Sequence, residues 1–162
     1  MTLVEPSRGL VELFYRADVL NAHIDELEQR GASTVRVDGG SWNKEAALED
    51  LRVALDFPDH YGSNLDALSD CMFDVVAGEC GFQGSSGTRL LALYQFDSLA
   101  RADQWFAHQL VDVLYEAAVM ALKLGKPFLV MLQSDDPDLS IGPVGTTHIG
   151  WNRTEWARSS RA

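Results

Sequence analysis

Three short runs of hydrophobic residues, separated by stretches of helical period, dominate the pattern of the chain. The run at 34–38 alternates and is β-branched, whereas 89–95 and 128–132 are almost continuously apolar, which is typical of strands covered on both faces. The longest helical period lies between the last two runs, and we expect one helix over 98–124. Because crossover connections are right-handed, the three strands should be parallel.

Two shorter helices are expected between the first and second strands. The first follows Asn43, a helix-capping residue, and is stopped by Pro58. The second should begin at Ser63 or Asn64 and run to about Val76. The sequence therefore predicts an α/β fold: a small parallel sheet of about three strands packed with helices, which segments near either end of the chain could extend.

Outside this central pattern the signals are weaker. Residues 10–15 could form a strand and 19–30 a short amphipathic helix, whereas the last part of the chain is rich in turn residues. We expect loops there, with Trp151 and Trp156 as aromatic anchors, and a frayed end. We expect an N-terminal extension packed on the core, a central domain and a C-terminal extension, at 1–33, 34–134 and 135–162.

Composition narrows the classes of partner. The chain has 162 residues and a formal net charge of −11 at pH 7, which repels nucleic acid and anionic lipid and attracts basic proteins. We therefore expect no direct nucleic-acid binding and no membrane contact. The sequence shows neither a long apolar run nor the pattern of a signal peptide, so we expect a cytoplasmic protein, with Cys71 and Cys80 as reduced thiols.

No pattern in the sequence indicates catalysis. The two cysteines do not form a Cys-x-x-Cys pair, and the glycines at 78, 81 and 84 lack the lysine of a phosphate-binding loop and precede a strand. The histidines are scattered without the spacing of metal ligands: His23, His60, His108 and His148. We expect a protein that is not an enzyme, with no catalytic residues, no cofactor and no metal site.

A long acidic segment is the sharpest feature of the charge pattern. Between Arg52 and Arg89 there is no lysine or arginine. In the expected second helix three aspartates one turn apart, Asp66, Asp70 and Asp74, lie opposite the apolar side. Like charges at this spacing weaken a helix by roughly 0.2–0.5 kcal/mol per pair, so folding alone does not favour them. The arrangement favours binding of a partner over a merely solvated surface.

Among these aspartates, Asp70 is the first candidate for partner contact. Asp66 has a second possible role, because a carboxylate in the first turn of a helix can satisfy a backbone N–H and complement the dipole. Asp70 lies in the middle of the polar side and has no such role. Phe73 and Ser69 lie beside the acids, and Phe73 could either supply apolar contact to a partner or fold against the glycine-rich loop.

The segment 57–71, Phe-Pro-Asp-His-Tyr-Gly-Ser-Asn-Leu-Asp-Ala-Leu-Ser-Asp-Cys, resembles the barstar family. The matching positions include Gly62, Asn64, Asp66 and Asp70 at the family's spacing, and the order of elements over 34–134 agrees. The resemblance implies an intracellular inhibitor of a secreted guanyl-type ribonuclease, whose active site is plugged by the loop and helix. It implies that Asp70 replaces an RNA phosphate, that Asp66 is a second acidic contact, and that Gly62 and Asn64 meet the enzyme.

The expected partner is therefore a basic extracellular ribonuclease. Three positions depart from the family pattern: His60 where the first interfacial aromatic is common, Ser69 where a tryptophan is common, and Met120 where a contacting glutamate is expected. They leave open an immunity or regulatory module for another basic toxin nuclease or protein. The candidate partner-binding residues are Asp59, His60, Tyr61, Gly62, Asn64, Asp66, Ser69, Asp70, Phe73 and Asp74.

Overall fold

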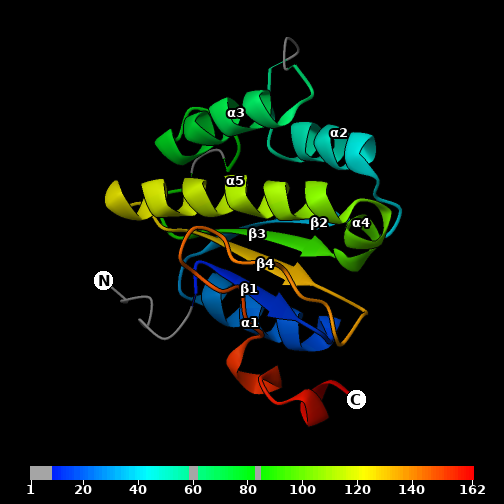
Figure 1. The fold of residues 1–162 in the computed structure, drawn as a ribbon. Coiled ribbons are helices and arrows are strands. Elements are labelled where there is room, and N and C mark those ends of the chain that lie inside the picture. The colour runs from blue at the N-terminus through cyan, green and yellow to red at the C-terminus, as the bar shows by residue number, and fades with distance from the viewer. Residues whose placement is uncertain (1–8, 59–61, 83–84) are drawn as a thin grey trace.

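A four-stranded parallel sheet forms the centre of the protein. The computed structural model describes residues 9–58, 62–82 and 85–162. The sheet has the order β1-β4-β3-β2, and all neighbouring strands are parallel (Figure 1). The strands are β1 (Val11–Phe14), β2 (Ser33–Asp38), β3 (Arg89–Tyr94) and β4 (Phe128–Gln133). The predicted α/β class and parallel sheet are confirmed, and the fourth strand comes from the N-terminal segment.

Helices cover both faces of the sheet (Figure 1). The connection from β1 to β2 crosses the sheet in one direction, and those from β2 to β3 and from β3 to β4 return in the other. Right-handed crossovers therefore place α1 on one face and the remaining α-helices on the opposite face. The five are α1 (Ala17–Gln29), α2 (Lys44–Ala54), α3 (Leu65–Ala77), α4 (Asp97–Ala102) and α5 (Gln104–Lys123).

The two faces have separate apolar cores because side chains alternate along each strand. In β3, Leu90 packs toward α1 with Leu20 and Ile24, whereas Leu91 packs toward the larger helical layer. In that larger layer α3 packs on α5, on the side away from the sheet (Figure 1). The helix α3 is therefore an outer element, and its far side is free to meet a partner.

The prediction of a single helix over 98–124 is wrong, because the helix is interrupted at Asp103, between α4 and α5. This residue has an extended backbone (φ −159°, ψ 90°), and its carboxylate accepts a hydrogen bond from the backbone N–H of Phe106 at 2.9 Å. It therefore caps α5 and ends α4. Leu99 and Phe106, on either side of the break, are both buried, so the apolar period continues across it and hid it from the sequence pattern.

The expected frayed C-terminus is also wrong, because a buried carboxylate fixes it to the residues that follow β1. Glu155, only 2% exposed, accepts hydrogen bonds from the backbone N–H groups of Tyr15 at 2.8 Å and Arg16 at 3.0 Å. Asn152 donates a further hydrogen bond to Glu155 at 2.8 Å. These contacts join the C-terminal segment to the connection between β1 and α1.

A buried arginine holds the last residues. Arg161 donates hydrogen bonds to the carbonyls of Pro137, Glu155 and Trp156, and its guanidinium lies 4.3 Å from the ring centre of Trp151. Of the two expected aromatic anchors, Trp151 is half-buried under this arginine, and Trp156 is 71% exposed. In the part of the chain that the structure describes, no helix is both long and apolar enough to span a membrane.

Candidate functional site

The acidic helix α3 begins at an asparagine cap. The side-chain carbonyl of Asn64 accepts a hydrogen bond from Ala67 N–H at 2.8 Å, and its amide donates to the carbonyl of Gly62 at 3.3 Å. Of the two expected starting residues, Asn64 is therefore the cap, and Ser63 has the left-handed backbone of a turn (φ 51°). The side chain of Asn64 orders the end of the loop, so this position contributes through loop geometry.

The other end of α3 is held by a buried arginine at the start of β3. Gly78 ends the helix with φ 86°, which favours glycine. Arg89, 4% exposed, donates hydrogen bonds to the carbonyls of Val75 at 2.6 Å, Val76 at 3.3 Å and Lys126 at 2.7 Å. Burial lowers the pKa of this guanidinium. A cation at a helix C-terminus also complements the helix dipole.

Sequence reasoning missed this role of Arg89. In the sequence, Arg89 marks the end of the cation-free segment and the start of the predicted strand 89–95. The available signal was a charged residue at the first position of an otherwise apolar strand. An arginine that is buried there must satisfy its donors within the protein.

The two sides of α3 differ in burial as the helical period predicts. The apolar side packs inward and consists of Leu68, Cys71, Met72, Val75 and Val76. The opposite side exposes Asp66, Asp70 and Asp74. Phe73 is 40% exposed, and Ser69 is half-buried. The structure therefore brings these five candidate residues to one outer surface, which we call the acidic face of α3.

No cation of the chain neutralises this face within the described residues. Over 9–58, 62–82 and 85–162, the ion pairs involve other carboxylates, such as Glu49 with Arg52 at 2.7 Å. The unpaired charge acts on the thiols behind the face. Burial, followed by the charges of Asp74 and Asp70, raises the pKa of Cys71.

The pKa of the Cys80 thiol is raised as well. Burial is the largest cause of its shift, and Asp74 is the next; together with smaller effects they raise the pKa of Cys80 to about 11. Sequence reasoning expected reduced thiols, and both cysteines are free.

Other candidate residues add less to the described surface. Gly62 is exposed and next to the cap of α3. Asp59, His60 and Tyr61 lie outside the described residues. Met120, which replaces an expected glutamate, is half-buried and packs against the main core.

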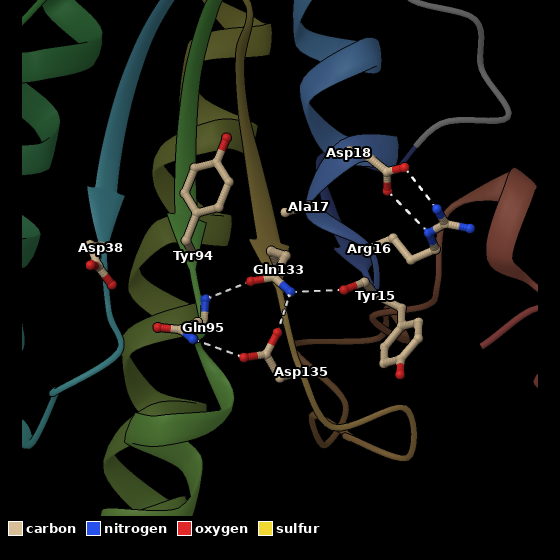
Figure 2. A pocket seen from close by; sticks show the side chains of 9 residues that line it. All are labelled: Tyr15, Arg16, Ala17, Asp18, Asp38, Tyr94, Gln95, Gln133 and Asp135. Atoms are coloured by element: carbon tan, nitrogen blue, oxygen red, sulfur yellow. Dashed lines mark hydrogen bonds and ion pairs between the residues drawn. The ribbon is translucent and has the colours of Figure 1, made fainter. Parts of the chain in front are cut away.

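A cavity of about 880 Å³ lies at the carboxyl ends of the strands (Figure 2), and none of its lining residues belongs to α3. Its centre is Gln133, 2% exposed, which accepts a hydrogen bond from Gln95 N–H at 2.8 Å and donates to the carbonyl of Tyr15 at 2.8 Å and to Asp135 at 3.0 Å. Hydrogen bonds from Gln133 and Gln95 lower the pKa of Asp135. Since these polar groups satisfy one another, the network serves to join β1 to β3 and β4.

In the described part of the chain, no group of three or more His, Cys, Asp or Glu side chains is arranged to hold a metal ion. What the acidic face can do chemically is accept hydrogen bonds from cationic groups. Charge-assisted hydrogen bonds of this kind are about twice as strong as neutral ones.

Comparisons with known proteins show the family of the chain. Residues 32–133 match the family model described as Barstar (barnase inhibitor), and this match covers more than half of the chain. A stretch of 37 residues is 54% identical to "Putative ribonuclease inhibitor YrdF" of Bacillus subtilis (strain 168). That alignment covers 22% of this chain and 41% of the relative, so it spans less than half of the relative's length. On the family match, the chain belongs to the barstar family.

Proposed function

We propose that this protein inhibits a secreted guanyl-type ribonuclease by placing the acidic face of α3, with the loop before it, in the active site of the enzyme. The barstar family match and the name of the Bacillus relative support an inhibitor of ribonuclease. The active site of a ribonuclease must hold cationic side chains, because its substrate is a polyanion. A carboxylate in the position of an RNA phosphate forms charge-assisted hydrogen bonds with those side chains.

The observation that carries this proposal is the position of Asp70. It is exposed in the middle of α3, one helical turn from Asp66 and from Asp74, and no cation of the described chain pairs with it. Three like charges at this spacing repel each other in the free protein. A partner with cations in its cleft removes that repulsion, so binding gains from the charges that folding disfavours.

The helix is also well prepared for binding. Asn64 fixes its first turn, and Arg89 fixes its last turn through the carbonyls of Val75 and Val76. Each end therefore keeps its geometry before the partner arrives, which reduces the ordering entropy lost on association. The carboxylates project from a rigid element.

Gly62 supports the same docking surface. A Cβ atom at this position would lie 3.4 Å from the Cβ of Ala67 and 3.5 Å from the side-chain nitrogen of Asn64, which is ordinary contact. The backbone of Gly62 does not require the left-handed region either. Among the described residues, none therefore demands glycine at this position, and close approach of a partner's backbone would account for it.

In this proposal the protein has no catalytic role and acts in the cytoplasm. Binding there would neutralise a toxic nuclease before it reaches cellular RNA. The long-range field of a chain with net charge −11 would speed its encounter with a basic enzyme. The partner is a protein, and neither nucleic acid nor a membrane is bound directly.

The test is a titration of purified guanyl-preferring secreted ribonucleases with this protein, following cleavage of RNA. We expect activity to fall linearly to zero at one inhibitor per enzyme, and the protein alone to cleave no RNA. Full ribonuclease activity at a tenfold molar excess of the protein, for every guanyl-preferring enzyme tested, would contradict the proposed target.

Two residues are a reason to include other basic toxin nucleases among the enzymes that are titrated. Ser69 and Met120 replace a tryptophan and a glutamate of the family pattern, and both are half-buried, Ser69 on α3 and Met120 on α5, on which α3 packs. A nuclease whose surface around the active site differs from that of the guanyl-type enzymes would fit these smaller or apolar side chains. Inhibition of such an enzyme, with none of the guanyl-preferring ones, would assign the protein as an immunity module for that nuclease.

A further inference from the structure

The two edge strands of the sheet, β1 and β2, differ in whether other backbone covers their outer side. At β1, the C-terminal segment covers the edge: Leu13 N–H donates to the carbonyl of Gly150 at 2.9 Å, and Asn152 N–H donates to the carbonyl of Leu13 at 2.8 Å. The backbone groups of Leu13 that point out of the sheet are therefore satisfied. The opposite edge is β2.

The backbone of β2 is open on its outer side. Ser33 N–H donates to the carbonyl of Thr88 at 2.9 Å and Gly39 N–H to that of Tyr94 at 2.7 Å, so odd-numbered residues of β2 face β3. The N–H and C=O groups of Thr34, Arg36 and Asp38 consequently point away from the sheet. Within the described parts of the chain, no hydrogen bond involves these backbone groups.

The strand also lacks most features that keep edges from pairing. Such features include proline, lysine, bulges and very short strands. β2 is six residues long and contains no proline and no lysine, and its register with β3 runs without a bulge. Its one cation is Arg36, whose contact with Glu28 is long at 3.6 Å and exposed. Asp38 lies two residues further along the same side of the strand.

We propose that two copies of this protein associate through β2, as an antiparallel pair that joins the two sheets into one. Charge selects the register. With a twofold axis at Val37, Arg36 of each copy lies directly opposite Asp38 of the other, where side chains on one face of a sheet interact. A register shifted so that Arg36 faces itself would oppose two like charges. The favoured register makes four backbone hydrogen bonds and two ion pairs between copies.

Asp38 is available for this pairing. Its carboxylate accepts a hydrogen bond from Gly40 N–H at 2.8 Å, and its side chain is exposed. Figure 2 shows it at the end of β2, apart from the dashed network around Gln133. A carboxylate has two oxygens and several acceptor positions, so the turn at Gly40 leaves room for the guanidinium of a second copy.

Analytical ultracentrifugation of the full chain with a charge-swap series tests the proposal. The salt is held at about 0.15 M, where the Debye length of about 8 Å screens repulsion between the acidic copies. We expect a reversible monomer–dimer equilibrium in the wild type. Arg36→Asp or Asp38→Arg should each weaken dimerisation roughly tenfold, because exposed ion pairs become like-charge contacts. The double variant should recover the wild-type constant.

Arg153→Asp is the control matched to Arg36→Asp, because it makes the same change in net charge at an exposed residue of the C-terminal segment. It should dimerise like the wild type. A wild type that stays monomeric up to millimolar concentration would overturn the proposal. A double variant that is no better than either single variant would overturn it too.

Amide hydrogen exchange locates the contact. The amides of Arg36 and Asp38 point out of the sheet and should exchange quickly in dilute protein, then slow at concentrations that form the dimer. The amide of Val35 faces β3 and should be protected at both concentrations. Dimerisation that leaves the amides of Arg36 and Asp38 unprotected would place the contact elsewhere and refute the pairing.

Discussion

Arg89, the first residue of β3, donates a hydrogen bond at 2.6 Å to the main-chain carbonyl of Val75, in the last turn of α3. The same guanidinium reaches the carbonyls of Val76 and Lys126. One buried side chain thus ties the acidic helix both to the strand that follows it and to the turn before β4. The position of α3 depends on this cation.

Replacing Arg89 by methionine should lower the free energy of unfolding by about 3 kcal/mol, because the buried carbonyls of Val75 and Val76 and the part-buried carbonyl of Lys126 lose their donor, and each unsatisfied buried group is costly. The measurement is urea denaturation followed by circular dichroism. Arg158→Met is the control, since Arg158 pairs with Asp138 at an exposed site and its loss should cost under about 1 kcal/mol. Equal losses for the two variants would remove the special role of Arg89.

The contact of Glu155 with the start of α1 supports a second prediction. Glu155→Ala removes a buried carboxylate that accepts hydrogen bonds from Tyr15, Arg16 and Asn152. Because hydrogen bonds to a charged group contribute more than neutral ones, we expect a loss of about 2–3 kcal/mol in the free energy of unfolding. Hydrogen exchange should show faster exchange of the amides of Tyr15 and Arg16.

Trp156→Ala is the matched control for this segment. Its side chain is 71% exposed, so the substitution should change stability by less than about 0.5 kcal/mol. If Trp156→Ala lowers the free energy of unfolding as much as Glu155→Ala, apolar contact holds this segment, and the hydrogen bonds of the Glu155 carboxylate are not its main anchor.

Much of the fold could be predicted because period and turn residues agree along the chain. Continuous apolar runs marked β3 and β4, and Asn64 lay at the start of a helix with one apolar side. The interruption between α4 and α5 at Asp103 could not be predicted from the hydrophobic pattern, because apolar positions continue across it. Capping depends on the backbone conformation of one residue, which hydrophobic period does not encode.

The site was predicted in part for the same reason. The acidic face of α3 follows from helical spacing, so Asp66, Asp70 and Asp74 could be grouped by their positions along the chain. The contacts that hold the helix and the chain ends could not be predicted, since Arg89 and Glu155 act on residues that are distant in sequence. Local patterns carry no information on which distant carbonyl or N–H group a buried charge will reach.

The thiol of Cys80 offers a probe of the acidic face. Because burial and then Asp74 raise its pKa to about 11, its thiolate fraction at pH 8 is about a hundredfold smaller than that of a thiol with the ordinary pKa of 9.0. Alkylation by iodoacetamide, resolved by mass spectrometry, should be correspondingly slow. Asp74→Asn should speed it, whereas Asp25→Asn on α1 should not.

The same shift gives a pH dependence of stability. The unfolded chain releases the Cys80 proton near pH 9, and the folded chain keeps it until about pH 11. The unfolded state therefore binds fewer protons in this range, and the free energy of unfolding falls as pH rises from about 9 to 11. Cys80→Ser should flatten this part of the profile. If the free energy of unfolding of Cys80→Ser falls with pH as steeply as that of the wild type, other titrating groups cause the fall.

The last prediction ranks the aspartates of α3 in the proposed inhibition of a ribonuclease. Asp70→Ala should weaken inhibition more than Asp66→Ala or Asp74→Ala, because the middle carboxylate faces the centre of the cleft and its loss leaves the enzyme's cations buried without a partner. Breaking a buried ion pair costs about 3–5 kcal/mol, that is, roughly a hundredfold to several thousandfold in affinity. Asp66 is the second residue of α3, so part of its contribution is to the helix dipole, and its alanine variant should melt slightly lower. Asp70→Ala should melt at or slightly above the wild type, since it relieves repulsion from its two neighbours. Inhibition constants against one ribonuclease, together with melting temperatures, separate binding from folding for each variant. If Asp70→Ala inhibits that ribonuclease as well as the wild type does, the acidic face of α3 is not what enters the active site.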